Sequence, residues 1–66
     1  MNITLNGDAF ELNEGAKLID LIAHLGLIGK RFAIEVNEEI IARSEHHAFL
    51  ISDGDCVEVV QAIGGG

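Results

Sequence analysis

Three consecutive glycines, Gly64, Gly65 and Gly66, are the residues whose chemistry stands out most in this sequence. Glycine makes up about 7% of an average protein, so such a triplet at a chosen position arises by chance roughly 0.0003 of the time. Because glycine has no Cβ, a glycine segment can enter a narrow channel and present its α-carboxylate to another protein's active site. The ionised carboxylate can attack the α-phosphorus of ATP, and the resulting acyl adenylate accepts a sulfur or nitrogen nucleophile. The alternative is a frayed end without function. The apolar strand pattern that runs from Val57 to Ile63 directly into the glycines favours the chemical interpretation.

The length and charge of the chain limit the classes of function. Its 66 residues allow one domain, and a domain this small has little room for a deep pocket of its own. The 4 Lys and Arg residues against 11 Asp and Glu residues give a net charge of −7, which repels nucleic acids and anionic membranes. We therefore expect no nucleic-acid or membrane partner. A basic protein surface fits this charge as a partner, although the charge can also serve solubility alone.

No other group of residues predicts a reactive site. Cys56 is the single cysteine, so an internal disulfide is excluded, and we interpret it as a small hydrophobic residue. His46 and His47 beside Glu45 lack a third ligand at suitable spacing, so a solvated loop is a better interpretation than a metal site. We expect a cytoplasmic protein, since the sequence shows no signal peptide and no membrane-spanning stretch.

Hydrophobic periodicity predicts the elements of the amino-terminal half. Residues 2–13 alternate around an Asn6-Gly7 turn, which predicts a β-hairpin. A helix follows from Lys17 onward, opened by Asn13 or Glu14 and closed by Gly26. The inner face of the hairpin consists of Ile3, Leu5, Phe10 and Leu12, and the apolar face of the helix of Leu18, Ile19, Leu21, Ile22 and Leu25. Lys30 and Arg31, in the loop after the helix, contribute half of the basic side chains.

Three further segments complete an α+β domain. We expect a strand at 32–37, a short partner at 40–42 and a closing strand at 56–63, with Ser44 as a possible cap of one helical turn. One helix then covers one face of a mixed sheet. In the closing strand, Val57, Val59 and Ile63 share one parity. If this set faces the helix, Val60 and Ala62 lie on the open face, either as a partner-docking patch or as scattered surface apolar residues.

The order of these elements, with several short motifs, resembles the ThiS family across the whole chain. The motifs are Asn6-Gly7, the segments 33–37, 40–45 and 53–60, and the glycines at the end. The resemblance implies a single ubiquitin-like β-grasp domain at 1–63 with the last strand central in the sheet. It also implies a flexible glycine tail at 64–66. Two positions depart from the family: Glu38 stands where glycine is common, and His46 where tryptophan is frequent.

The resemblance also implies a role in thiamine biosynthesis. An E1-like adenylating enzyme would use ATP and Mg²⁺ to activate the carboxylate of Gly66. Sulfur from the persulfide of a cysteine desulfurase would then form a thiocarboxylate, and thiazole synthase would take that sulfur into the thiazole ring. Gly65 and Gly66 match the functional pair of the family, and Gly64 matches a third glycine that many members carry. The chain would be a recycled co-substrate, not an enzyme, and would bind no metal or cofactor of its own.

Three other interpretations remain open from the sequence. The small subunit of molybdopterin synthase has a similar fold and tail, but is usually longer. A ubiquitin-like modifier would instead link its tail to lysine side chains. A plain interaction module would not need its glycines.

Overall fold

The structure is a computed structural model that describes residues 1–61 of the chain, and five strands, one α-helix and one short 3-10 helix make up this part. In chain order they are β1 (Asn2–Leu5), β2 (Asp8–Glu11), α1 (Leu18–His24), β3 (Phe32–Val36), β4 (Glu39–Ile40), η1 (Arg43–Glu45) and β5 (Cys56–Gln61).

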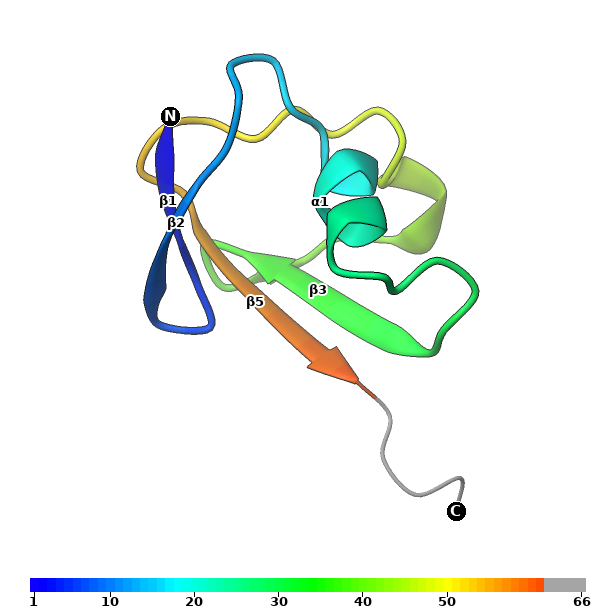
Figure 1. The fold of residues 1–66 in the computed structure, drawn as a ribbon. Coiled ribbons are helices and arrows are strands. Elements are labelled where there is room, and N and C mark those ends of the chain that lie inside the picture. Colours follow the sequence, from blue (N-terminus) through cyan, green and yellow to red (C-terminus); the bar gives the residue numbers. More distant parts are fainter. Residues whose placement is uncertain (62–66) are drawn as a thin grey trace.

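The five strands form one mixed sheet in the order β2-β1-β5-β3-β4. The last strand, β5, lies in the centre: it pairs in parallel with β1, at Thr4 and Cys56, and antiparallel with β3 from Val36 and Val57 to Phe32 and Gln61. The helix α1 crosses one face of this sheet, and within residues 1–61 no helix covers the other face (Figure 1). The predicted α+β class and the β-grasp arrangement are therefore confirmed.

Two antiparallel hairpins flank the central strand. The first joins β1 and β2 through Asn6 and Gly7, which have φ values of 51° and 85°. Such left-handed values at both turn positions match the twist of the flanking strands. The second joins β3 and β4 through Asn37 and Glu38, with φ values of 51° and 70°. The tight turn is thus formed even though Glu38 replaces glycine, and pairing begins at Glu39, one residue before the predicted start of the short strand.

The helix begins later than either predicted cap. Lys17 is its N-cap and Asp20 accepts a 2.8 Å hydrogen bond from the Lys17 N–H, so Asn13 and Glu14 do not open it. The chain before the helix is held extended by an antiparallel bridge between Lys17 and Leu50, which prevents an earlier helical turn. Gly26 ends the helix as predicted: its φ is +72°, a conformation that costs glycine little.

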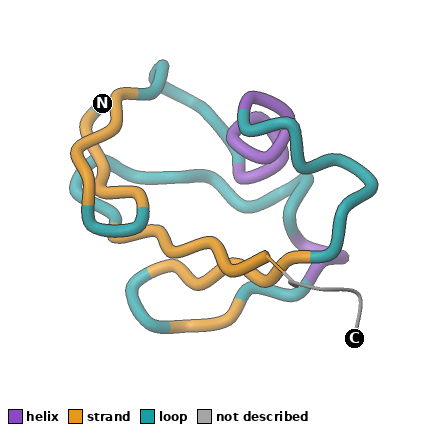
Figure 2. Tube along the Cα trace, turned by 60° about the horizontal axis from the view of Figure 1, so that its bottom comes forward, coloured by secondary structure: helices purple, strands orange, loops and turns teal. Residues whose placement is uncertain are grey.

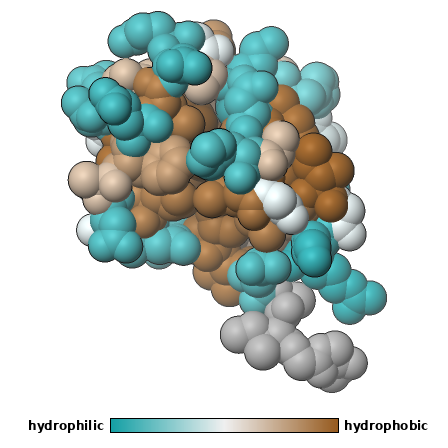
Figure 3. Space-filling view, viewed as in Figure 1, coloured by the Kyte–Doolittle hydropathy of each residue, from teal (hydrophilic) through white to brown (hydrophobic). Residues whose placement is uncertain are grey.

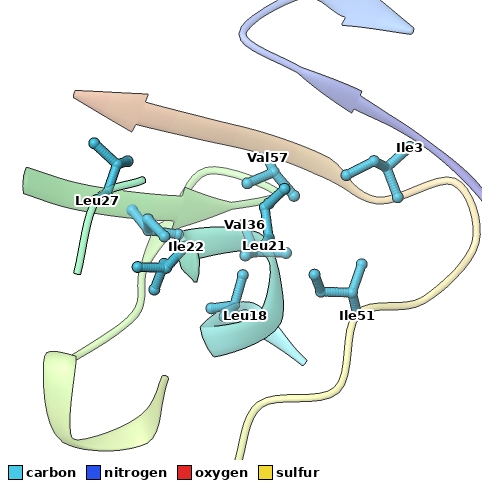
Figure 4. Packing of buried hydrophobic residues seen from close by; sticks show 9 residues of the cluster. Ile3, Leu18, Leu21, Ile22, Leu27, Val36, Ile51 and Val57 are labelled. Atoms are coloured by element: carbon cyan, nitrogen blue, oxygen red, sulfur yellow. The ribbon is translucent and has the colours of Figure 1, made fainter. Parts of the chain in front are cut away.

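The core lies between α1 and the covered face of the sheet (Figure 4). Leu18, Leu21 and Ile22 of the helix pack against Ile34 and Val57 of the two central strands. The remaining fully packed residues of this cluster are Ile3, Leu27, Val36 and Ile51. All residues of the predicted inner faces of the hairpin and helix belong to the cluster or pack against it.

The segment after β4 differs from the prediction in two respects. Ser44 is not a cap, because η1 starts at Arg43 and Ala42 occupies the capping position without a side-chain hydrogen bond. His46 is not a solvated loop residue: only 5% of its surface is exposed. Its Nε2 lies 3.1 Å from the carbonyl oxygen of Ile41, and its ring stacks on that of Phe32 at 5.8 Å. The Ile41 carbonyl and the Phe32 ring thus give the buried imidazole a hydrogen-bond partner and a packing surface. By the resemblance, tryptophan is frequent at this position.

Candidate functional site

The predicted reaction centre, Gly66, lies outside the described residues, as do Gly64, Gly65 and Ala62 and the predicted boundary at Ile63. What the structure describes is the base from which these residues continue. Gln61, the last described residue, pairs with Phe32 at the start of β3. The described part of β5 therefore ends where β3 begins, and η1 lies nearby (Figure 2).

The base is tied to the sheet on both sides. Val57 of β5 is completely buried, and its carbonyl accepts a 2.9 Å hydrogen bond from the N–H of Asn6. The side-chain Oδ1 of Asn6 in turn accepts a 2.7 Å bond from the N–H of Val59. Leaving either group unpaired would cost free energy, so these two bonds hold β5 to the turn after β1. Pairing with β3 from Val57 to Gln61 holds its other side. The sequence predicted Asn6 as a turn residue. It did not predict the hydrogen bond that the Asn6 side chain accepts.

The strand presents the two faces that its parity predicted. Val57 is buried and Val59 half-buried against the helix, whereas Cys56, Glu58 and Val60 are exposed on the open face. Val60, a predicted docking residue, is 62% exposed and lies opposite the exposed Ala33 of β3.

An acidic pair lies beside this apolar position. Glu35 of β3 and Glu58 of β5 are direct cross-strand partners, and Ile40 of β4, 74% exposed, lies on the other side of Glu35. Like charges directly opposite each other destabilise a sheet. The open face therefore combines exposed apolar residues with carboxylates, which suits a partner surface that is apolar and basic. The pairing of β3 with β5 and β4 brings these apolar and acidic residues together, and the sequence of one strand alone does not show it.

The described residues can be checked for a metal-binding cluster and for an activated thiol. Within residues 1–61 no group of three or more His, Cys, Asp or Glu side chains is placed to hold a metal ion. The exposed Cys56 shares a hollow with Glu35, Glu38 and Glu58, and no His, Lys or Arg lines that hollow among the described residues. None of the helices in the described part of the chain is long and apolar enough to span a membrane.

Comparison with known proteins extends the resemblance through the glycines. The model of the ThiS family matches residues 3–66. The sulfur carrier protein ThiS of Bacillus subtilis is 34% identical over 65 residues, which cover 97% of this chain and 98% of that protein. A thiazole synthase of Magnetococcus marinus is 35% identical over all 66 residues, but the chain spans only 20% of its length.

A solved structure agrees with the fold. The thiamine biosynthesis protein ThiS of Geobacter metallireducens superposes with a TM-score of 0.84 at 30% identity, over the full length of both chains. Since the family model covers nearly the whole chain and the B. subtilis relative matches it from end to end, the chain belongs to the ThiS family.

Proposed function

We propose that this chain is a sulfur carrier in thiamine biosynthesis, with the α-carboxylate of Gly66 as the group that carries sulfur. The observation that supports this most strongly is the family match over residues 3–66, which includes both the β-grasp domain and the three glycines.

The chemistry follows from that carboxylate. An E1-like adenylating enzyme binds ATP and Mg²⁺, a carboxylate oxygen of Gly66 attacks the α-phosphorus, and pyrophosphate leaves. A sulfur nucleophile, whose sulfur originates from a cysteine desulfurase persulfide, then attacks the acyl adenylate at the carbonyl carbon and displaces AMP. When that nucleophile is the persulfide itself, the product is an acyl disulfide. A reducing thiol then attacks the sulfur on the donor's side of the S–S bond, forms a disulfide with the donor and releases the chain as a thiocarboxylate. Activation splits a difficult substitution into two easier ones.

The chain contributes recognition rather than catalysis to this proposal. Every bond-making step is assigned to partner enzymes, and the folded domain supplies a rigid base that those enzymes recognise. The exposed Val60, with Ala62 two residues further on, forms the proposed docking face for the adenylating enzyme. Two carboxylates, Glu35 and Glu58, are paired across the strands beside Val60. They favour a docking surface on the enzyme that also carries a cation.

Thiazole synthase is the proposed acceptor. The thiazole synthases of Magnetococcus marinus and Paramagnetospirillum magneticum each match this whole chain with only 20% of their length. In those proteins a segment similar to this chain is thus covalently joined to a much longer remainder. A separate carrier and a separate synthase would form the same pair without the covalent link. A docking surface would then bring the two proteins together in its place.

The test is mass analysis of the chain after incubation with ATP, Mg²⁺, the adenylating enzyme and a sulfur donor. Cys56→Ser removes the only thiol, so an alkylating reagent can label only a thiocarboxylate, and fragmentation separates a label at Gly66 from oxidation of Met1. We expect the label at Gly66. We also expect that deletion of Gly66 leaves the far-ultraviolet circular dichroism spectrum unchanged and abolishes ATP-dependent adenylation.

The other outcomes distinguish the alternatives. An unmodified Gly66 carboxylate in the presence of an active enzyme would remove the support for sulfur carriage. Conjugates between the tail and lysine side chains in cell extracts would instead indicate a ubiquitin-like modifier. Sulfur transfer to a molybdopterin precursor, in place of thiazole, would indicate the other sulfur-carrier pathway.

A further inference from the structure

The last strand of the sheet is paired on both sides only at its beginning. Pairing between β1 and β5 stops at Leu5 and Val57, because the chain turns into β2 after Leu5. Pairing between β3 and β5 continues to Phe32 and Gln61. Within residues 1–61, β3 is thus the only strand beside the second half of β5 (Figure 1). The end of β5 is therefore a local edge of the sheet, although β5 is its central strand.

The hydrogen bonds with β3 determine where the main-chain groups of β5 point. In an antiparallel pair, residues that exchange hydrogen bonds alternate with residues whose N–H and C=O groups point away from the partner strand. Asn37, directly after β3, donates its N–H to the carbonyl of Cys56 over 2.8 Å. By this alternation Val57, Val59 and Gln61 are not bonded to β3, and their main-chain groups point toward the side of β1.

Asn6 provides the last hydrogen bonds on that side. Its N–H donates to the Val57 carbonyl over 2.9 Å, and its Oδ1 accepts from the Val59 N–H over 2.7 Å. The Val59 carbonyl and the Gln61 N–H come next along β5, and they have no hydrogen-bond partner within residues 1–61. One residue of a strand that lay parallel to β5, as β1 does, would bond both groups through its own N–H and C=O.

This edge lacks the charges that protect the other edges of the sheet. Proteins keep free edges from pairing with other chains by placing charged residues on them or by making them very short. The edge strand β2 carries Asp8 and Glu11, and the edge strand β4 is 2 residues long and begins with Glu39. By contrast, the sequence from Val59 to Gly66 contains no charged side chain. The end of β5 is therefore suited to pair with another main chain.

A hollow of about 210 Å³ lies along the same edge. The side chains of an added strand would alternate between the two faces of the sheet, so one of them could enter this hollow. Figure 3 shows hydrophobic residues at the surface close to the described end of the chain. Most of the lining is apolar, which suits an apolar side chain. The lining consists of Leu5, Leu25, Leu27 and Val59, together with Asn6 and Gln61.

We propose that an extended segment of the adenylating enzyme adds to the sheet at this edge, beside Val59 and Gln61, with one apolar side chain in the hollow. This inference rests on the proposed function. The free carbonyl and the free N–H identify the occupant as an extended main chain, since strand addition satisfies both groups, and the hollow selects the side chain that it carries. The adenylating enzyme is the partner because its proposed docking residue, Val60, lies between Val59 and Gln61 in the same strand.

Gln61→Pro tests the main-chain bond, because proline has no N–H. The Gln61 N–H faces the free edge, so the substitution removes no hydrogen bond of the described structure, and an extended residue such as Val60 is compatible with a following proline. Ala9→Pro on β2 is the matched control. Ala9 is exposed, and because Leu12 donates its N–H to the Met1 carbonyl, the same alternation directs the Ala9 N–H away from β1.

The affinity is measured by isothermal titration of the adenylating enzyme with the carrier, in the presence of Mg²⁺ and a non-hydrolysable ATP analogue. We expect Gln61→Pro to raise the Kd about tenfold, because it leaves a carbonyl of the enzyme unpaired, and Ala9→Pro to change it less than about twofold. Circular dichroism checks that both variants are folded.

Amide hydrogen exchange of the native carrier tests the same bond without a substitution. In the free carrier the N–H groups of Gln61 and Ala9 both face a free edge, so both should exchange rapidly. We expect the enzyme to slow exchange at Gln61 by at least about tenfold and to leave exchange at Ala9 unchanged.

Either measurement can overturn the inference. Unchanged affinity of Gln61→Pro, or rapid exchange at Gln61 in the complex, would show that no strand pairs there, while adenylation of the native chain at Gly66 would still support sulfur carriage. Protection of Gln61 by self-association of the carrier, or by thiazole synthase alone, would assign the edge to another occupant and would also overturn the inference. A native chain that an active adenylating enzyme neither binds nor adenylates would contradict the proposed function and the inference together.

Discussion

Replacing Glu38 by glycine is expected to stabilise the domain by about 1 kcal/mol. Glu38 has a φ of +70°, in the left-handed region, which costs a residue with a Cβ roughly 1–2 kcal/mol. Glycine escapes this cost, but loses about 0.5–1 kcal/mol more backbone entropy on folding. The difference favours glycine. The corresponding turn position in the other hairpin is Gly7, with a φ of +85°, so the same chain already contains the favourable version of this turn.

Far-ultraviolet circular dichroism is the suitable measurement, because the chain has no tryptophan or tyrosine to report unfolding by fluorescence. For a domain of this size, 1 kcal/mol raises Tm by about 4–8 °C. Gly7→Ala should lower the free energy of unfolding by a comparable amount, because it introduces the strain that Glu38→Gly removes.

Two controls separate backbone strain from charge. Glu38→Gln removes the carboxylate but keeps the Cβ, so it should gain little, whereas Glu38→Asn should gain part of the effect because asparagine tolerates the left-handed region. If Glu38→Gln stabilised the domain as much as Glu38→Gly, repulsion from nearby carboxylates would be the cause, and the argument from φ would be refuted.

Three further predictions concern other parts of the scaffold. Val60→Asp should raise the Kd for the adenylating enzyme about tenfold, as expected for a central docking residue, with less than about 1 kcal/mol lost in stability; unchanged affinity in a titration would remove the case for that face. Asn6→Ala should cost about 2 kcal/mol in urea unfolding, since it loses the bond to the Val59 N–H and strains a residue at φ 51°; Asn2→Ala, exposed and without a side-chain bond in the described structure, is its control. Leu21→Ala, at a completely buried position, should cost about 3 kcal/mol in the same assay.

The features that alternation controls were predictable from the sequence. The closing strand is an example: the parity of Val57, Val59 and Val60 predicted which residues face the helix, and the structure confirms it. Side chains alternate between the two faces of a strand. Once one face is known to be buried, the residues of the other parity are assigned to the opposite face. The Asn6-Gly7 turn was predictable for a similar reason, because few residue pairs accept two left-handed conformations.

The features set by distant contacts were not predictable. The helix starts at Leu18 because Lys17 bridges to Leu50, far along the chain, and no local cap signal reports that bridge. His46 is buried because Phe32 and the Ile41 carbonyl surround it, whereas its sequence neighbours suggested a solvated loop. The hollow that both Ile28 and Arg43 line is a third example, since these two residues meet only through the fold.

The central position of β5 fixes the base of the segment that carries the proposed reactive carboxylate. An edge strand is hydrogen-bonded on one side and can separate from its sheet, which would let the base of the tail move. β5 is instead held on both sides through its first residues, by β1 and Asn6 on one side and by β3 on the other, while its end at Gln61 is paired with Phe32 of β3. Val57 is buried in the core. To displace Gln61 from Phe32, part of the sheet must open. The described end of β5 therefore has a defined place beside β3, and five residues of the sequence follow it.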